Sequence, residues 1–259
     1  MAPTNRFDIS GRNYIVTGGA QGIGYKALET LAESGANVVG LDIKSQPSVD
    51  YATLASRFGV KAQYFQADVA NKESLTTAFH KADLWTDPSP VRGIALEKAF
   101  EETTWNETRR LQEINVVGTY HSAQLIAEQL KKQGKSGSIV LIASITSHTV
   151  LPFHRMSAYG ASKGAVKTLS EALAIELAPH KIRVNSISPG FIDTEMTQEV
   201  RTANPKMNDI MQNCPPLQRI GTRDDLTGAI IYLLSDAASY TTGADIAITG
   251  GLHVGRIGT

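Results

Sequence analysis

Tyr159 and Lys163 stand four residues apart in YGASKGAVKTLS, a segment with the small and apolar residues of a helix. Residues at this spacing lie on one helical face, so the ammonium group can approach the phenol. A phenol has a pKa of about 10, and a neighbouring ammonium favours the phenolate and lowers that value. The pair could therefore exchange a proton with an alcohol or a ketone. Because the same spacing also arises by chance on helix surfaces, its meaning depends on the residues around it.

The glycine-rich turn TGGAQGIG, residues 17–24, could bind a nucleotide phosphate. It follows a predicted buried strand, Asn13–Gly18, and its glycines let the backbone approach a diphosphate at the positive N-terminus of the next helix. Asp42 ends the following predicted strand, where a carboxylate can bind the diol of an adenosine ribose. The turn residues that we assign to a cofactor are Thr17, Gly18, Gln21, Gly22, Ile23 and Gly24.

Short β-branched runs alternate with helical patterns, which predicts an α/β fold with a doubly wound parallel sheet and helices on both faces. No repeat or low-complexity linker divides residues 1–259, so we expect a single domain. The further predicted strands are Ala36–Ile43, Lys61–Val69, Gly137–Ser144, Ile182–Gly190 and Ala244–Gly251. The longest predicted helices are Trp105–Gln133, Ser157–Leu177 and Arg223–Leu234.

The composition is that of a neutral globular protein. Of 259 residues, 42% are hydrophobic, and 25 basic residues balance 25 acidic ones. A chain without net charge or a basic stripe gives no basis for nucleic-acid or membrane binding. The single cysteine, Cys214, cannot form an internal disulfide, and we find no signal peptide, so we expect a cytoplasmic protein. No histidine spacing indicates a metal site.

The order of TGxxxGxG, the strand-end Asp42, YxxxK and SPG resembles the short-chain dehydrogenase/reductase family over nearly the whole chain. The resemblance implies an NAD(P)-dependent oxidoreductase that interconverts a secondary alcohol and a ketone by hydride transfer. Tyr159 then corresponds to the general acid/base, and Lys163 to the residue that lowers its pKa and binds the nicotinamide ribose. Asn115, in INVVG, corresponds to the family asparagine that kinks a helix and holds a water in the proton relay.

The resemblance also implies a serine that binds the substrate oxygen, and three hydroxyl residues compete for this role. The usual family spacing before Tyr159 falls on Thr146, whereas Ser144, at the end of a predicted strand in LIAS, better matches the local context. We choose Ser144, and Thr146 and Ser147 remain alternatives. His148 and His154 are expected near the mouth of the same site, in a surface or lining role.

The family pattern implies further contacts with the cofactor. Those under the nicotinamide, in SPGFIDTEM, are Pro189, Gly190, Ile192 and Thr194. In ADV, Asp68 would accept a hydrogen bond from the adenine amine, next to Val69. Asp42 would repel a 2′-phosphate and no arginine offsets it, which favours NAD, with NADP possible. Residues 193–216 are the expected substrate lid.

The predicted helix Ser157–Leu177 indicates self-association. It carries small and apolar residues on more than one face, which is more than packing against one sheet requires. Together with the family likeness, this excess favours a homodimer or a homotetramer. The residues concerned are Ala158, Gly160, Ala161, Gly164, Ala165, Leu169, Ala172 and Leu173.

The segment Asp83–Phe100, DLWTDPSPVRGIALEKAF, does not fit the family pattern. The family places its fourth strand and an NNAG turn here, but Leu84–Gly93 carries two prolines and a polar run. We therefore expect a loop or a short distorted strand beside a weakened cofactor floor. An adaptation, a splice or frame artefact and a loss of catalysis would each explain the segment. The alternative to an enzyme is a catalytically impaired member that binds cofactor or serves a non-redox or scaffolding role.

Overall fold

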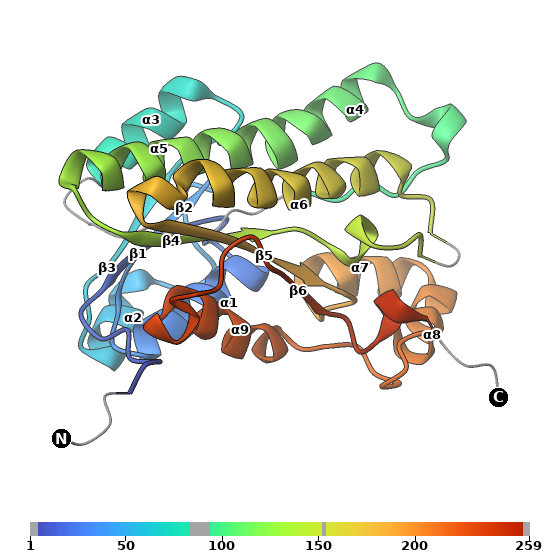
Figure 1. Cartoon of the computed structure of the whole chain (residues 1–259). Coiled ribbons are helices and arrows are strands. Elements are labelled where there is room, and N and C mark those ends of the chain that lie inside the picture. Colours follow the sequence, from blue (N-terminus) through green and yellow to red (C-terminus); the bar gives the residue numbers. More distant parts are fainter. Residues whose placement is uncertain (1–4, 83–93, 152–153, 256–259) are drawn as a thin grey trace.

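The strands follow one another in the predicted order. The computed structural model describes residues 5–82, 94–151 and 154–255 (Figure 1). The strands within these residues are β1 (Asn13–Thr17), β2 (Asn37–Asp42), β3 (Ala62–Gln66), β4 (Gly137–Ile142), β5 (Ile182–Pro189) and β6 (Asp245–Ile248). Each lies inside a predicted strand, and the predicted residues beyond the C-terminal ends of β4 and β5 belong to turns that carry the site.

Several helices begin at a side chain that caps them. Asp50, Asn71 and Thr104 each accept a hydrogen bond from a backbone N–H of the helix that follows, which satisfies a donor that has no partner inside the helix. The α-helices among the described residues are α1 (Gly22–Glu33), α2 (Tyr51–Phe58), α3 (Lys72–Lys81), α4 (Trp105–Gln112), α5 (Gly118–Gln133), α6 (Ser157–Leu177), α7 (Glu195–Ala203), α8 (Pro205–Asn213) and α9 (Thr227–Leu234).

The described strands pair in two parallel blocks, β1-β2-β3 and β4-β5-β6. In the first block Val16 lies opposite Gly40, and in the second Ile187 lies opposite Ile246. A single continuous sheet was expected, but no strand pairing among the described residues joins the two blocks. The predicted lack of a regular strand from Leu84 to Gly93 falls outside the described residues.

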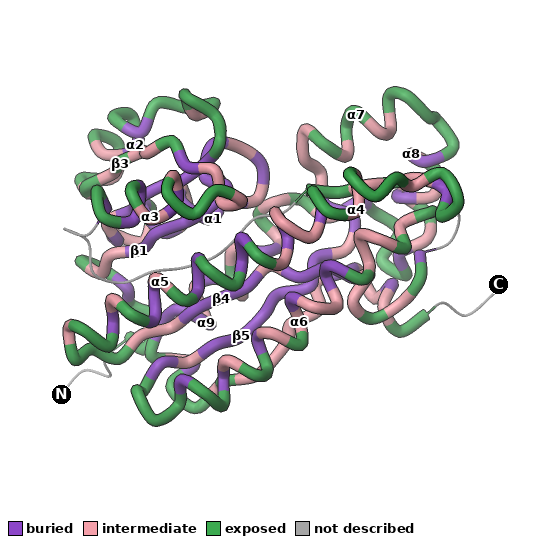
Figure 2. The backbone as a smooth tube through the Cα atoms, turned by 90° about the horizontal axis from the view of Figure 1, so that it is seen from above, coloured by how far each residue is buried: buried purple, intermediate pink, exposed green. Residues whose placement is uncertain are grey.

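Helices cover both faces of these strands (Figure 1). Helices α3, α5 and α6 pack on one face, and α1, α2 and α9 pack on the other, as a doubly wound fold requires. Strands β1, β2, β4 and β5 are mostly buried (Figure 2), because both of their faces are covered, whereas β3 and β6 at the outer edges of the two blocks are largely half-buried. Helices α7 and α8 pack against each other at one end of the molecule, within the segment predicted as a substrate lid.

The predicted helix Trp105–Gln133 is interrupted by one wider turn. Residues Glu113–Val117 form a π-helical turn between α4 and α5, and Asn115 lies inside it. Such single π turns occur often at functional sites. The predicted irregularity at Asn115 is therefore present in the structure. The predicted helix Arg223–Leu234 likewise starts as a 3-10 turn, Arg223–Leu226, before α9.

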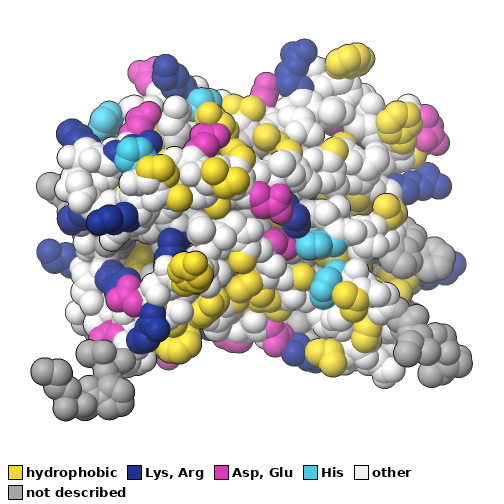
Figure 3. Space-filling view, viewed as in Figure 1, with side chains coloured by type: hydrophobic (Ala, Val, Ile, Leu, Met, Phe, Trp, Pro, Cys, Tyr) yellow, Lys and Arg dark blue, Asp and Glu magenta, His cyan; other side chains and the backbone are white. Residues whose placement is uncertain are grey.

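The surface carries both signs of charge. On the face shown in Figure 3, basic and acidic side chains are interspersed, as the balanced composition predicts. In the part of the chain that the structure describes, no helix has the length and apolar content needed to cross a membrane.

Candidate active site

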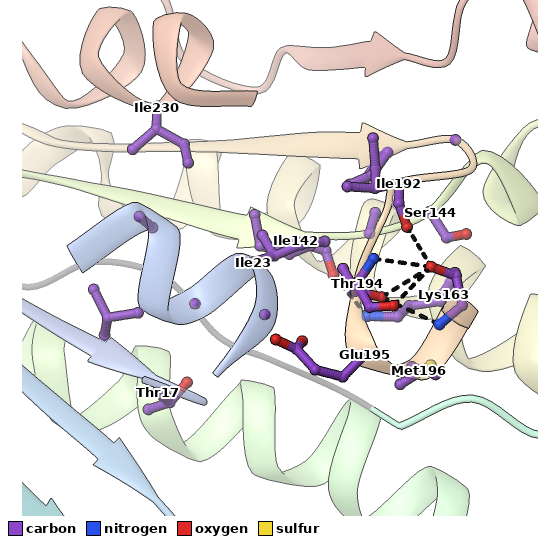
Figure 4. A pocket seen from close by; sticks show the side chains of 18 of the residues that line it. Thr17, Ile23, Ile142, Ser144, Lys163, Ile192, Thr194, Glu195, Met196 and Ile230 are labelled. Carbon is purple, nitrogen blue, oxygen red and sulfur yellow. Dashed lines mark hydrogen bonds between the residues drawn. The ribbon is translucent and has the colours of Figure 1, made fainter. Parts of the chain in front are cut away.

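A pocket lies where β1, β4 and β5 end (Figure 4). Parallel strands place the loops that follow them at one edge of the sheet, so residues distant in sequence meet there. The pocket is bounded by the ends of these strands, by the start of α1, by the first turns of α6 and by the start of α7. The predicted residues that line it are Thr17, Gly22, Ile23, Gly24, Ser144, Tyr159, Lys163, Pro189, Gly190, Ile192 and Thr194.

Tyr159 and Lys163 face this pocket from the first two turns of α6, as their spacing predicted. Lys163 Nζ lies 5.9 Å from the centroid of the Tyr159 ring and donates a hydrogen bond of 2.8 Å to the carbonyl oxygen of Ile142, the last residue of β4. Burial lowers the pKa of Lys163 to about 8. The lysine is therefore only partly charged just above neutral pH.

The pKa of Tyr159 behaves differently from the sequence expectation. Burial raises the pKa of the phenol above its ordinary value, and a hydrogen bond with Ser144 acts in the opposite direction without cancelling the rise. The chain by itself therefore does not lower the Tyr159 pKa in the way expected from Lys163, because the cost of desolvating the phenolate outweighs the other interactions. Tyr159 is accordingly a protonated group at neutral pH.

The geometry separates the three candidate hydroxyl residues. Ser144 lies two residues after the end of β4, is 6% exposed, lines the pocket and is hydrogen-bonded to Tyr159. Its Oγ accepts a hydrogen bond of 3.2 Å from the Thr146 backbone N–H, which fixes the short turn Ile145–Ser147. The hydroxyls of Thr146 and Ser147 are buried, have no hydrogen-bond partner among the described residues and are not part of the pocket lining. The arrangement therefore favours Ser144 over Thr146 and Ser147 as the candidate for binding the substrate oxygen.

Asn115 is fully buried and its side chain is held by three hydrogen bonds. Its Oδ1 accepts from the Ile94 N–H at 2.7 Å, and its Nδ2 donates to the Ile94 carbonyl and to Ser162 Oγ, both at 2.9 Å. The amide thus ties the π turn to the segment at Ile94 and to α6, one residue before Lys163. Both Nδ2 hydrogens are used, so the side chain supports the site by positioning these three segments.

The glycine-rich turn has the shape that a diphosphate requires. Gly22, the first residue of α1, has φ +60° and lines the pocket, where an added Cβ would come near only one neighbouring atom, Oε2 of Glu195 at 3.5 Å. At Gly24 an added Cβ would lie 2.1 Å from the Gly18 carbonyl oxygen, so only glycine allows the turn to pack against the helix. The residues present therefore fit the diphosphate of a dinucleotide at the start of α1.

The predicted adenosine contacts lie away from the pocket lining. Asp42 is 6% exposed, and its carboxylate accepts hydrogen bonds from the backbone N–H of Ala20 at 3.1 Å and of Lys44 at 3.2 Å. The Lys44 ammonium donates to Gln21 Oε1 at the outer side of the glycine-rich turn. Asp68 accepts a hydrogen bond from the Ala70 N–H at 2.9 Å. Gly18, Gln21, Asp42, Asp68 and Val69 are not among the residues that line the pocket.

Several pocket residues were not predicted from the sequence. Glu195, Met196 and Thr197 reach the pocket from the start of α7, and Ile230 reaches it from α9. The first three directly follow Thr194, so extending the SPG loop by one helical turn would have found them. Ile230 carries no comparable signal, because its position depends on how α9 packs against α1 and β4.

Each of the two histidines expected near the site mouth lies close to a carboxylate, but only His148 is hydrogen-bonded to it. His148 Nε2 lies 2.7 Å from Asp245 Oδ2, and the ring of His148 contacts that of His253. The His154 side chain is 3% exposed and lies 3.3 Å from a carboxylate oxygen of Glu97. Among residues 5–82, 94–151 and 154–255, no group of three or more His, Cys, Asp or Glu side chains could hold a metal.

Comparisons with known proteins agree with this fold. The family model described as enoyl-(acyl carrier protein) reductase matches residues 18–253. A short-chain type dehydrogenase/reductase from Mycobacterium marinum superposes with a TM-score of 0.90 at 35% identity, over 95% of this chain and 97% of the other. The chain thus belongs to the short-chain dehydrogenase/reductase family, and it is an NAD(P)-dependent oxidoreductase.

Two further relatives are named after the substrates on which they act. Sorbose reductase of Schizosaccharomyces pombe is 34% identical over 258 residues, which cover 96% of this chain and 98% of the relative. A gluconate 5-dehydrogenase from Burkholderia cenocepacia, solved in complex with NADP and tartrate, has a TM-score of 0.88 at 28% identity, over 97% of this chain and 98% of the other.

Proposed function

We propose that this enzyme reduces a ketone to a secondary alcohol with Tyr159 as the proton donor. The observation that carries the proposal is the meeting of Tyr159, Ser144 and Lys163 in the pocket beside the glycine-rich turn. When bound, the nicotinamide supplies the hydride. The Ser144 hydroxyl would hold the carbonyl oxygen, and Tyr159 Oη would donate the proton to that oxygen as the hydride reaches the carbon.

The protonated form of Tyr159 is the form that reduction requires. A phenol that stays protonated at neutral pH is ready to donate, whereas oxidation of an alcohol would need the phenolate first. A charged Lys163 stabilises the phenolate that forms after the proton has left. Lys163 lies one helical turn from Tyr159 and is held in place by the Ile142 carbonyl.

We infer that the substrate is a polyhydroxylated ketone of the sugar or sugar-acid type. Relatives with closely similar length act on sorbose and gluconate by name, which supports this class. The test is a panel of ketoses, keto acids of sugars and simple aliphatic ketones, each offered with NADH and NADPH while cofactor absorbance is followed. We expect turnover with a member of the first two groups. Cofactor binding without turnover on the whole panel would instead support the non-redox alternative.

For the cofactor, we propose that the pocket accepts both NADP(H) and NAD(H), with a preference for NADP(H). The Asp42 carboxylate, which by its charge favours NAD, is directed to the N–H groups of Ala20 and Lys44. The Lys44 ammonium, beside Gln21, is a cation that could meet a 2′-phosphate. The NADP in the Burkholderia structure supports the same assignment.

For assembly, we propose a homodimer or homotetramer formed through α6. The helix exposes Ala161, Ala172 and Ile175 on the side away from β5, and Ile175 is 78% exposed. Small exposed residues allow two helices to approach closely across a twofold axis. Light scattering at micromolar concentration tests this proposal, and a monomer would count against it.

A further inference from the structure

The N-terminus of α1 has no capping side chain and no acidic residue from its own first turn. Gln21 precedes the helix without capping it through its side chain, and the first turn contains no acidic residue. A helix N-terminus carries a positive partial charge that favours a nearby anion. In contrast, α3 and α4 each have a capping side chain and a glutamate in the first turn.

The carboxylate of Glu195 lies at this position. Glu195 is the first residue of α7, and in Figure 4 its side chain points across the pocket toward the start of α1. Its Oε2 lies 3.5 Å from the point that a Cβ on Gly22 would occupy, and its Oε1 lies 3.2 Å from Nη1 of Arg223. One carboxylate therefore sits between the N-termini of α1 and α7, and an arginine holds it there.

This location is also where the diphosphate of the cofactor must bind, if the proposed function is right, because the glycine-rich turn leaves space there. We infer that Glu195 competes with the cofactor diphosphate for the start of α1 and thereby sets the affinity of the pocket for both dinucleotides. Cofactor binding displaces the carboxylate. Since Glu195 begins α7, its displacement transmits cofactor binding to the helix pair α7–α8, the expected substrate lid.

Arg223 has the opposite effect on affinity in this account. Its guanidinium holds Glu195 near α1, and its positive charge lies 3.2 Å from this carboxylate, although Arg223 itself is not part of the pocket lining. Once Glu195 has moved, Arg223 remains as a cation close to the phosphates. Removing the glutamate charge should therefore strengthen cofactor binding. Removing the arginine charge should weaken it, because the Glu195 carboxylate stays attracted to the start of α1 while the cation near the phosphates is lost.

The test measures dissociation constants for NADPH and NADH by cofactor fluorescence, with purified wild-type protein and two isosteric variants. Glu195→Gln removes the competing charge and keeps the side-chain shape. Glu199→Gln removes an exposed charge one turn further along α7, outside the pocket lining, and is the matched control. We expect about three- to thirtyfold tighter binding of both cofactors in Glu195→Gln, a difference that shrinks at high salt, and no such change in Glu199→Gln.

The outcomes separate this inference from the proposed function. Equal dissociation constants in wild type and Glu195→Gln would overturn the competition, and so would equal tightening by Glu199→Gln. If neither cofactor binds to wild type or to any variant, the proposed function itself fails. Arg223→Gln is an independent test of the direction of the effect, because we expect it to weaken cofactor binding about three- to tenfold. Amide hydrogen exchange in Glu195–Ala203 should change when NADPH is added to wild type, and an unchanged rate would contradict the link to α7.

Discussion

The imidazole of His148 lies 2.7 Å from the carboxylate of Asp245, and this contact joins the turn after Ser144 to strand β6. The same carboxylate accepts hydrogen bonds from Ser186 and from Ser188, the residue before Pro189. Asp245 therefore connects the segment that carries Ser144 with the strand that ends under the expected nicotinamide position. The side chain of Asp245 is 6% exposed, so its loss would leave buried donors without a partner.

We predict that Asp245→Ala lowers the free energy of unfolding by about 2–4 kcal/mol, because three donors lose their acceptor. The turnover number should fall as well, since the turn holding Ser144 is released from β6. Urea denaturation and ketone reduction measure the two effects. Glu171→Gln, which breaks an exposed ion pair with Lys167 on α6, is the control and should change stability by less than about 1 kcal/mol. Similar effects of both variants would contradict the role of Asp245.

The buried Lys163 should make stability depend on pH in a defined window. Its pKa is about 8 in the folded protein and 10.5 ordinarily. Below pH 8 the ammonium is charged in both states, and the folded state carries the full cost of burying it. Between about pH 8 and 10.5 the folded state releases the proton first, so this cost is relieved as pH rises. The size of the effect is about 3 kcal/mol.

The measurement compares wild type with Lys163→Met by urea denaturation at several pH values. We expect the stability of wild type relative to the variant to rise between pH 8 and 10.5. Lys131→Met, on the exposed side of α5, is the matched control and should show a much smaller trend. A flat difference across this window would show that Lys163 is not a desolvated cation in the free protein.

Asn115 should matter for stability as much as for catalysis. Asn115→Ala removes three buried hydrogen bonds to Ile94 and Ser162, and we expect it to lower the free energy of unfolding by about 2–4 kcal/mol. Asn106→Ala, on the exposed surface of α4, provides the comparison and should have little effect. Thermal or urea unfolding measures both. An Asn115→Ala protein as stable as Asn106→Ala would mean that the π turn does not depend on this amide.

Cofactor choice should depend on two residues with opposite effects. Asp42→Asn keeps an acceptor for the Ala20 N–H but removes the negative charge, so we expect NADPH to bind more tightly relative to NADH. Lys44→Gln should weaken NADPH about three- to tenfold and leave NADH nearly unchanged. Fluorescence titration with both cofactors measures the ratio. Equal effects of Lys44→Gln on the two cofactors would remove Lys44 from 2′-phosphate recognition.

Much of the fold could be predicted from local patterns. Buried strands such as Gly137–Ile142 contain continuous β-branched and apolar runs, and α6 begins and ends at the predicted residues. The positions of Tyr159 and Lys163 follow from helical spacing alone. The direction of the Tyr159 pKa could not be predicted, because it depends on how completely the surrounding segments remove water from the phenol.

The parts that sequence patterns missed depend on contacts between distant segments. Glu195 and Arg223 are 28 residues apart and meet only because α7 and the turn before α9 both face α1. Ile230 reaches the pocket for the same reason. Local periodicity contains no information on such contacts, and the preference for one cofactor over another is equally dependent on the orientation of Asp42 and Lys44.

The most direct test of the account is the Tyr159→Phe variant, measured for NADPH oxidation at saturating ketone and, separately, for NADPH binding by fluorescence. The substitution removes the phenolic oxygen and keeps the ring, so packing on Lys163 is retained. We predict that kcat falls about 10²- to 10⁴-fold while the dissociation constant of NADPH stays within about threefold of wild type. A variant that keeps the wild-type kcat would remove Tyr159 from the reaction and contradict the proposed mechanism.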